Sequence, residues 1–183
     1  GPAPSQPKNT MSTTRPPKSQ RLKPSVPLHV AVVGAGNMGG AMAARLVEQG
    51  WSVVVCDIDP VRQQQARQAG AHVVATPVEA ASAMRSDAVL IVCVVDAAQS
   101  HAVLFGENGA VATLRPGQTV MLCPTIAPQD TEALAAALVE RGIGCIDAPM
   151  SGGPARARDG SMSLMLAAPS VLLARHADLL QAL

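Results

Sequence analysis

Lysine is missing from residues 28–183, and the three lysines of this 183-residue chain lie near its start, at Lys8, Lys18 and Lys23. Aromatic side chains are almost as scarce, with one Trp, one Phe and no Tyr. So few rings argue against the platforms on which single-stranded nucleic acids stack, and we expect no nucleic-acid partner.

Long apolar runs are missing too. None approaches the roughly 20 residues that span a bilayer, so we expect no membrane partner.

Paired cysteines are also lacking. None of the four cysteines forms a CxxC pair, and each lies in or at the end of an apolar run: Cys56, Cys93, Cys123 and Cys145. Because no secretory signal is evident, we expect small buried thiols of a reduced, cytoplasmic compartment rather than disulfides or zinc ligands. The sequence therefore predicts no metal site.

Charge divides the chain into two parts. Residues 1–27 carry five basic side chains, seven prolines and no acid, which predicts a disordered leader or tag. Residues 28–183 carry nine basic and thirteen acidic side chains. The chain as a whole is 48% hydrophobic, so we expect residues 28–183 to form one domain.

Apolar runs alternate with helical patterns along this domain. The runs that predict strands cover 28–33, 51–56, 72–75, 88–95, 118–123 and 143–148. The helical patterns cover 37–49, 59–70, 129–141 and shorter stretches that begin at Thr76 and Asp96. The alternation predicts an α/β fold with a doubly wound, mostly parallel, Rossmann-type sheet. The unbroken apolar run 88–95 should be a central strand. Beyond the last strand we expect a glycine-rich loop over 150–160 and an apolar helix over 171–183.

Residues 34–39 read Gly-Ala-Gly-Asn-Met-Gly and match G-x-G-x-x-G. The match follows a predicted strand, opens a predicted helix, and is followed by Asp57 at the end of the next strand, as a dinucleotide site requires. Gly34 would permit the tight turn, Gly36 would let a pyrophosphate approach the backbone, and Gly39 would allow close helix–strand packing. S-adenosylmethionine enzymes also combine a glycine turn with an acid after the second strand, so they are an alternative.

Asp57 bears on which dinucleotide binds. Its carboxylate can accept hydrogen bonds from the adenosine ribose and would repel a 2′-phosphate, which favours NAD over NADP. Arg62, the next arginine, keeps NADP open. Alternatively, Asp57 only caps its strand.

A second ordered motif, Asp-Ala-Pro-Met-Ser-Gly-Gly, occupies residues 147–153. It closely follows D-A-P-V-S-G-G, and residues 34–39 fit G-x-G-x-M-G. On these motifs, residues 28–168 resemble the β-hydroxyacid dehydrogenase family, which includes 3-hydroxyisobutyrate dehydrogenases, tartronate semialdehyde reductases and L-threonate dehydrogenases. The resemblance implies an NAD-dependent oxidoreductase acting on a small hydroxy acid.

The resemblance also implies site residues. The cofactor-binding set is Gly34, Gly36, Asn37, Met38, Gly39, Asp57, Val94, Val95 and Thr125. The substrate carboxylate would bind at Ser151, Gly152 and Gly153, where consecutive backbone N–H groups can surround an anion. Alternatively, this turn is only a tight connection between elements.

Two departures from the family pattern affect the expected substrate. Val94-Val95 stands where the family usually has Leu-Pro or Val-Pro, and Pro124 replaces one hydroxyl-bearing residue before Thr125. The stretch 94–99, Val-Val-Asp-Ala-Ala-Gln, is most similar to the L-threonate dehydrogenase branch. That similarity favours L-threonate or a related sugar acid, with tartronate semialdehyde and 3-hydroxyisobutyrate as alternatives.

The catalytic residue is not found among residues 28–183. Family members use a lysine that would lie just beyond Leu183 on a long helix, followed by an all-helical domain that completes the cleft and the dimer. The resemblance thus implies a homo-oligomer for the full-length protein and little turnover by this chain alone. A non-catalytic nucleotide-binding module is the alternative of another class.

Overall fold

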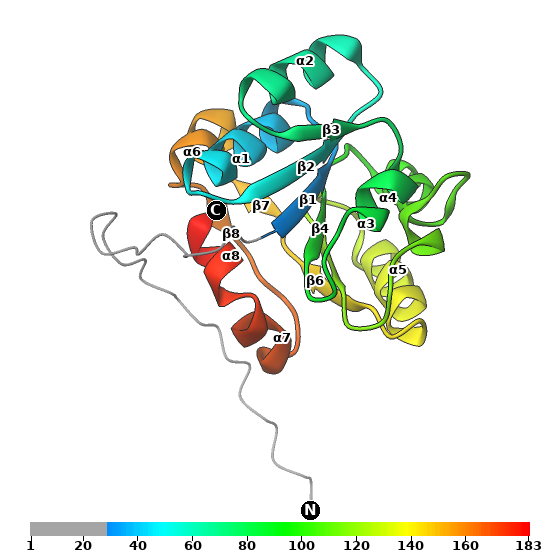
Figure 1. Ribbon diagram of the computed structural model, residues 1–183. Coiled ribbons are helices and arrows are strands. Elements are labelled where there is room, and N and C mark those ends of the chain that lie inside the picture. The colour runs from blue at the N-terminus through cyan, green and yellow to red at the C-terminus, as the bar shows by residue number, and fades with distance from the viewer. Residues whose placement is uncertain (1–28) are drawn as a thin grey trace, which may run out of the picture.

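The computed structural model describes residues 29–183 and shows a Rossmann-type α/β fold (Figure 1). The leader predicted over residues 1–27 lies outside the described residues. Six parallel strands form one sheet: β1 His29–Val33, β2 Ser52–Cys56, β3 His72–Val74, β4 Val89–Val92, β5 Thr119–Leu122 and β6 Gly144–Asp147. Their order is β3-β2-β1-β4-β5-β6, which reverses direction between β1 and β4. In open sheets of this kind, ligands bind outside the carboxyl ends of the strands at that reversal.

Helices cover both faces of the sheet, as a doubly wound fold requires. The helices are α1 Asn37–Glu48, α2 Pro60–Gln68, α3 Pro77–Ser82, α4 Ala97–Phe105, α5 Pro128–Glu140, α6 Gly153–Asp159, α7 Ser170–Arg175 and α8 Ala177–Ala182, with a 3₁₀ turn at Ala110–Ala112. Val30 and Val32 of β1 share a buried apolar cluster with residues of α1, α6 and α8. Ala31 and Val33 point to the opposite face and share a cluster with residues of α3, α4 and α5. The two layers are visible on either side of the sheet in Figure 1.

Three helices begin where the sequence predicts them to begin, and each has a side-chain cap at its start. Asp59 accepts a hydrogen bond from the backbone N–H of Val61, and Asp96 accepts one from Gln99. Thr76 accepts one from Glu79. Each cap satisfies a backbone donor that has no partner within its own helix.

The predicted strand over residues 88–95 is central but ends early, at Val92. The backbone N–H of Cys93 makes one last ladder hydrogen bond, to the carbonyl of Val33 at 2.8 Å. The chain then leaves the sheet, because the backbone N–H of Val95 bonds the side chain of Gln99 at 3.1 Å and Asp96 starts α4. Val95 is 79% exposed. The prediction of an eight-residue strand was therefore wrong at its carboxyl end.

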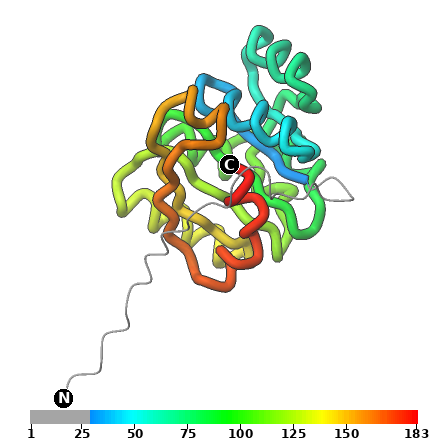
Figure 2. Tube along the Cα trace, turned by 90° about the vertical axis from the view of Figure 1, so that its left-hand side faces the viewer, coloured from blue at the N-terminus to red at the C-terminus, as the bar shows by residue number. Residues whose placement is uncertain are grey.

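The loop predicted over residues 150–160 is also wrong, because this segment is structured. Strand β7 (Met150–Ser151) pairs antiparallel with β8 (Ser163–Leu164). Helix α6 follows β7 and lies beside α1, as the orange and blue-to-cyan segments of Figures 1 and 2 show. Ala157, buried on α6, belongs to the apolar cluster beneath α1, so apolar burial holds the segment in place.

The single helix predicted over 171–183 is instead two helices, which meet at His176. The His176 ring is buried, and its Nε2 lies 2.9 Å from the Thr119 hydroxyl oxygen. This polar contact fixes the break between α7 and α8 against β5. At the other end of α8, the buried Arg45 of α1 donates a hydrogen bond from Nε to the Ala182 carbonyl at 3.0 Å.

Within residues 29–183, none of the helices combines the length and the apolar character needed to cross a membrane. All four cysteines carry free thiols. Cys56 and Cys123 are buried as predicted, whereas Cys93 and Cys145 are half-buried.

Candidate functional site

A cavity of about 730 Å³ opens at the carboxyl ends of the central strands, where the sheet order reverses. It gathers residues that lie far apart in the sequence. Eight of the nine predicted cofactor-binding residues line it: Gly34, Gly36, Asn37, Met38, Gly39, Asp57, Val94 and Val95. The fold therefore brings the glycine motif, the acid after β2 and the segment after β4 to one place.

Two glycines of the motif are required by the protein's own packing. Gly34 has φ +96°, and a Cβ added there would lie 2.4 Å from the Cys93 carbonyl oxygen. A Cβ on Gly39 would lie 1.8 Å from the Gly34 carbonyl oxygen. Real Cβ atoms do not approach backbone so closely, so both positions exclude every other residue without a backbone shift. These contacts agree with the predicted tight turn at Gly34 and the close helix–strand packing at Gly39.

Gly36 is different, because the packing of the chain does not explain it. Its φ of −64° and ψ of −164° are extended, a conformation open to any residue. The nearest atoms to an added Cβ belong to the Arg62 guanidinium, at 3.6–3.8 Å, an ordinary contact distance. These atoms belong to one long side chain and not to the backbone, so a ligand that displaces the Arg62 guanidinium can come close to the Gly36 backbone.

The first turn of α1 makes this place suitable for an anion. Gly36 precedes α1 and gives it no side-chain cap, so the first N–H groups of the helix are not consumed by a capping side chain. A helix N-terminus carries a partial positive charge and exposes donors to a bound phosphate. Gly36 and these donors fit the pyrophosphate of a dinucleotide.

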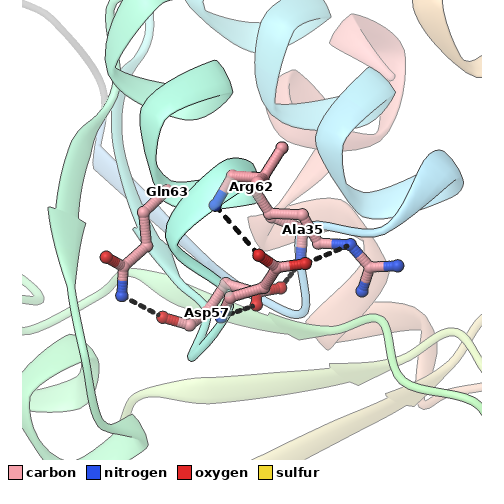
Figure 3. Close-up of polar contacts among 6 residues, drawn as sticks. Ala35, Asp57, Arg62 and Gln63 are labelled. Carbon is pink, nitrogen blue, oxygen red and sulfur yellow. Dashed lines mark hydrogen bonds and ion pairs between the residues drawn. The ribbon is translucent and has the colours of Figure 1, made fainter.

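Asp57 both caps its strand and faces the cavity. It is 8% exposed, and its two carboxylate oxygens accept hydrogen bonds from the backbone N–H groups of Ala35 and Asp59, each at 2.8 Å. Gln63 donates a further hydrogen bond to the Asp57 carbonyl at 2.6 Å (Figure 3). An ionised carboxylate has about four acceptor positions, so Asp57 keeps acceptors for two ribose hydroxyls. The two interpretations of Asp57 are therefore compatible.

Sequence reasoning missed the contributions of Ala35, Gln63 and Gln99. Ala35 and Gln63 hold Asp57 through backbone and side-chain hydrogen bonds, and Gln99 lines the cavity while it fixes Val95. The sequence places Gln63 near the start of the helix that Asp59 caps, and therefore close to Asp57 along the chain. The pairing of Ala35 with Asp57, 22 residues apart, follows from the alignment of β1 with β2.

Three cysteines, Cys56, Cys93 and Cys123, lie in the cavity wall. Burial, and then the neighbouring Asp57, raises the pKa of the Cys56 thiol to about 12. A hydrogen bond with Cys93, and then burial, raises the pKa of Cys123 well above its usual value. The raised pKa values favour the neutral thiol over the nucleophilic thiolate at both positions.

Four predicted residues lie beside the cavity rather than in its wall. Thr125 is exposed and follows Pro124, which is part of the wall. Ser151, Gly152 and Gly153 follow Met150, also part of the wall. The two glycines have φ +120° and +75°. Such a left-handed turn exposes backbone N–H groups.

Asp147, which precedes this turn, acts through its backbone. Its N–H and carbonyl exchange hydrogen bonds with Ala167, at 3.0 and 2.9 Å, and burial raises the pKa of its carboxyl. Asp147 is therefore part of the scaffold of the turn. In the described part of the chain, no group of three or more His, Cys, Asp or Glu side chains could hold a metal ion.

Comparison with known proteins agrees with this geometry. The family described as the NAD binding domain of 6-phosphogluconate dehydrogenase matches residues 29–183. The L-threonate dehydrogenase of Cupriavidus necator is 41% identical over 155 residues, which are 85% of this chain and 51% of that protein. The 3-hydroxyisobutyrate dehydrogenase of Pseudomonas aeruginosa is 31% identical over 153 residues, 83% of this chain and 50% of that protein.

The solved structures give the same result for the fold. The crystal structure of 3-hydroxyisobutyrate dehydrogenase from Salmonella typhimurium is similar with a TM-score of 0.78 and 33% identity, over 85% of this chain and 53% of that one. This chain thus spans about half the length of the relatives that it matches. The predicted resemblance is confirmed: the chain belongs to the family of the NAD-binding domain of 6-phosphogluconate dehydrogenase, together with L-threonate and 3-hydroxyisobutyrate dehydrogenases.

Proposed function

We propose that this chain is the cofactor-binding part of an NAD-dependent dehydrogenase that oxidises the CH–OH group of a small hydroxy acid. The observation that carries the proposal is the place of Gly36 at the N-terminus of α1, where the atoms nearest to an added Cβ belong to the Arg62 side chain and not to the backbone. The family membership and the cavity at the sheet reversal support it. The protein would act in the cytoplasm as a homo-oligomer.

The substrate that we propose is L-threonate. The 41% identity with an L-threonate dehydrogenase supports this choice over 3-hydroxyisobutyrate, for which the relative above is 31% identical. Tartronate semialdehyde is a further alternative. Ser151, Gly152 and Gly153 would bind the substrate carboxylate, because their turn lies beside the cavity and presents its backbone to solvent.

Each group at the cavity has a defined part in this proposal. The N–H groups at the start of α1 would hold the pyrophosphate, and Asp57 would accept the ribose hydroxyls. Val94, Val95 and Thr125 would flank the nicotinamide end. The bound nicotinamide supplies a hydride acceptor. The proton-transfer group would come from outside residues 29–183, so we expect this chain alone to bind NAD and turn over little.

Calorimetric titration with NAD tests the cofactor site. The parent chain should bind NAD, and Gly36→Ala should lose most of the binding because its methyl group occupies the approach of the pyrophosphate. The unfolding midpoint of Gly36→Ala should match the parent, because the new Cβ meets only ordinary contacts. Binding of NAD by the variant with parental affinity would contradict the site.

S-adenosylmethionine and NADP are the ligand controls. We expect no binding of S-adenosylmethionine and weaker binding of NADP than of NAD, because Asp57 repels a 2′-phosphate. Tighter binding of S-adenosylmethionine than of NAD would favour a methyltransferase-like protein.

The second candidate is a non-catalytic nucleotide-binding module, which the same cavity and the uncapped start of α1 would also fit. An assay of the full-length protein with L-threonate and NAD separates the two functions. NADH formation supports the dehydrogenase. Nucleotide binding without turnover of L-threonate or 3-hydroxyisobutyrate with NAD, or of tartronate semialdehyde with NADH, supports the module.

A further inference from the structure

Arg62 stands where the proposed pyrophosphate would arrive. It lies on the first turn of α2, whose start is fixed by the Asp59 cap and by Pro60. Its guanidinium is the group nearest to a Cβ added at Gly36, with Nη1, Cζ and Nη2 at 3.6, 3.7 and 3.8 Å from that position. Figure 3 shows its side chain extending from α2 toward the turn that contains Ala35. A positive charge thus lies across from the N-terminus of α1.

The position of Arg62 between two hollows gives its side chain room to move. It lines the cavity of about 730 Å³ and also a neighbouring hollow of about 320 Å³ between α1 and α2. Small side chains, including Ala41, Ala44 and Ala66, make up most of the lining of the smaller hollow, and Asn37, Gln65 and Arg158 complete it together with Arg62.

The ion pair of Arg62 is weak enough to be exchanged for a ligand. Its Nε lies 3.8 Å from Oδ2 of Asp59, and both side chains are about half exposed, at 48% and 44%. Exposed pairs of this kind contribute little to stability. The contact uses Nε, whereas the two terminal nitrogens are the atoms nearest to Gly36. These two nitrogens can therefore bind a phosphate while the side chain stays near Asp59.

Charge at the site is compatible with such a contact. Asp57 and Asp59 are the acids beside Arg62, and a phosphate would be repelled by both. Two backbone N–H groups partly balance the negative charge of the Asp57 carboxylate. The Asp59 carboxylate accepts a hydrogen bond from Val61 and forms an ion pair with Arg62. A guanidinium forms paired hydrogen bonds with phosphate oxygens, which are stronger than bonds between neutral groups.

We infer that Arg62 is a binding residue for the cofactor pyrophosphate, which it holds from the side opposite the N-terminus of α1. The inference rests on the proposed function and deepens it. The phosphates would lie between backbone N–H groups on one side and the Arg62 guanidinium on the other. The contact does not involve a 2′-phosphate, since that group would sit on the ribose at Asp57.

Titration calorimetry of the 183-residue chain tests the inference with NAD, NADP and ADP as ligands. Arg62→Ala should weaken the binding of all three by a similar factor of about ten or more, because all three carry a pyrophosphate. Arg62→Lys should recover part of the loss, because it keeps the charge but not the paired geometry. Arg67→Ala is the matched control: Arg67 is exposed on the same helix and lines neither hollow, so its affinities should equal those of the parent.

Four results would overturn the inference. Unchanged affinities of Arg62→Ala for NAD and ADP would show that Arg62 does not bind the pyrophosphate. A loss of affinity confined to NADP would show that Arg62 binds the 2′-phosphate instead. Equal losses in Arg62→Lys and Arg62→Ala would mean that the side chain acts by packing. An equal loss of affinity in Arg67→Ala would mean that the change in net charge, and not a contact of Arg62, weakens binding. Each of these results leaves the proposed function intact, whereas failure of the parent chain to bind any nucleotide contradicts both.

Discussion

Two glycine-containing turns lie in or beside the cavity, one after β1 of the parallel sheet and one after β7 of the two-stranded sheet, and they are held in different ways. The turn after β1 is enclosed by its own protein: Gly34 and Gly39 touch backbone, and Ala35 is bonded to Asp57. The turn that contains Gly152 and Gly153 is exposed to a large extent, and a Cβ on Gly153 would meet nothing within 4 Å. The glycines of the first turn meet backbone atoms, whereas in the second turn Gly152 faces only the Arg156 side chain and Gly153 faces open space.

This difference separates two reasons for a glycine. At Gly34 and Gly39, any side chain would collide with backbone, so their identity follows from the fold. At Gly153 the space is open and the positive φ favours glycine. The conformation of the first turn is therefore set by contacts within this chain, whereas the second turn presents an exposed backbone beside the cavity.

The largest effect should come from Gly39→Ala. Its Cβ would lie 1.8 Å from the Gly34 carbonyl oxygen, so α1 and β1 would have to separate. We expect the free energy of unfolding to fall by about 3 kcal/mol or more, the upper range for an overpacked site. Urea denaturation measures the change. If Gly39→Ala lowers the free energy of unfolding by less than Gly153→Ala does, the first turn is not the more tightly packed of the two.

Asp57→Ala should have the next largest effect. It leaves the backbone N–H groups of Ala35 and Asp59 without their acceptor, and hydrogen bonds to a charged group contribute about 1.5–3 kcal/mol. We expect a loss near 2 kcal/mol in the same denaturation assay. Asp57→Asn should lose less, because its amide oxygen still accepts one bond. If Asp57→Ala unfolds at the parental urea concentration, the first turn is not tied by this carboxylate.

Gly153→Ala should have a smaller effect. An alanine there meets no atoms but must hold φ near +75°, which costs roughly 1–2 kcal/mol for a residue with a Cβ. We expect a loss near 1 kcal/mol and unchanged NAD affinity. A clear loss of NAD binding in this variant would show that the two turns act on the same ligand.

The smallest effect should depend on pH and concerns Asp147, before the second turn. Burial raises the pKa of this carboxyl above 3.8 in the folded protein, so the folded state binds its proton more tightly than the unfolded state. The associated stability is present below pH 3.8 and is lost as the pH rises through the folded pKa. We expect Asp147→Asn to be stabilised relative to the parent at pH 7 but not at pH 3.5.

Thermal unfolding at several pH values measures this difference. A constant gap between the parent and Asp147→Asn across the range would show that the carboxyl does not titrate differently in the folded chain.

Sequence reasoning succeeded where the signal is local. The caps Asp59, Thr76 and Asp96 lie within three residues of the donors they bind, and the glycine motif was flanked by a strand and a helix. It failed where distant segments decide. The end of β4 at Val92 depends on its neighbour β1 and on α4. The break at His176 depends on Thr119 in the sheet, and α6 forms against α1.

The site follows the same rule. The glycines and Asp57 were predicted because their spacing matches a binding unit of one strand, one helix and one more strand. The position of Arg62 over Gly36 was not predicted, because the sequence does not fix the angle at which α2 packs against the sheet. The distance of Thr125 and of residues 151–153 from the cavity wall also depends on how the chain leaves β5 and β6.

The hydrogen bond from Ala35 to Asp57 has a consequence for the entropy of binding. It holds the first turn in one conformation before a ligand arrives, so little backbone freedom remains to be lost when a dinucleotide binds. The ordering cost then falls mainly on the flexible ligand. Short fragments that keep the pyrophosphate should therefore bind this chain with a high affinity for each of their atoms.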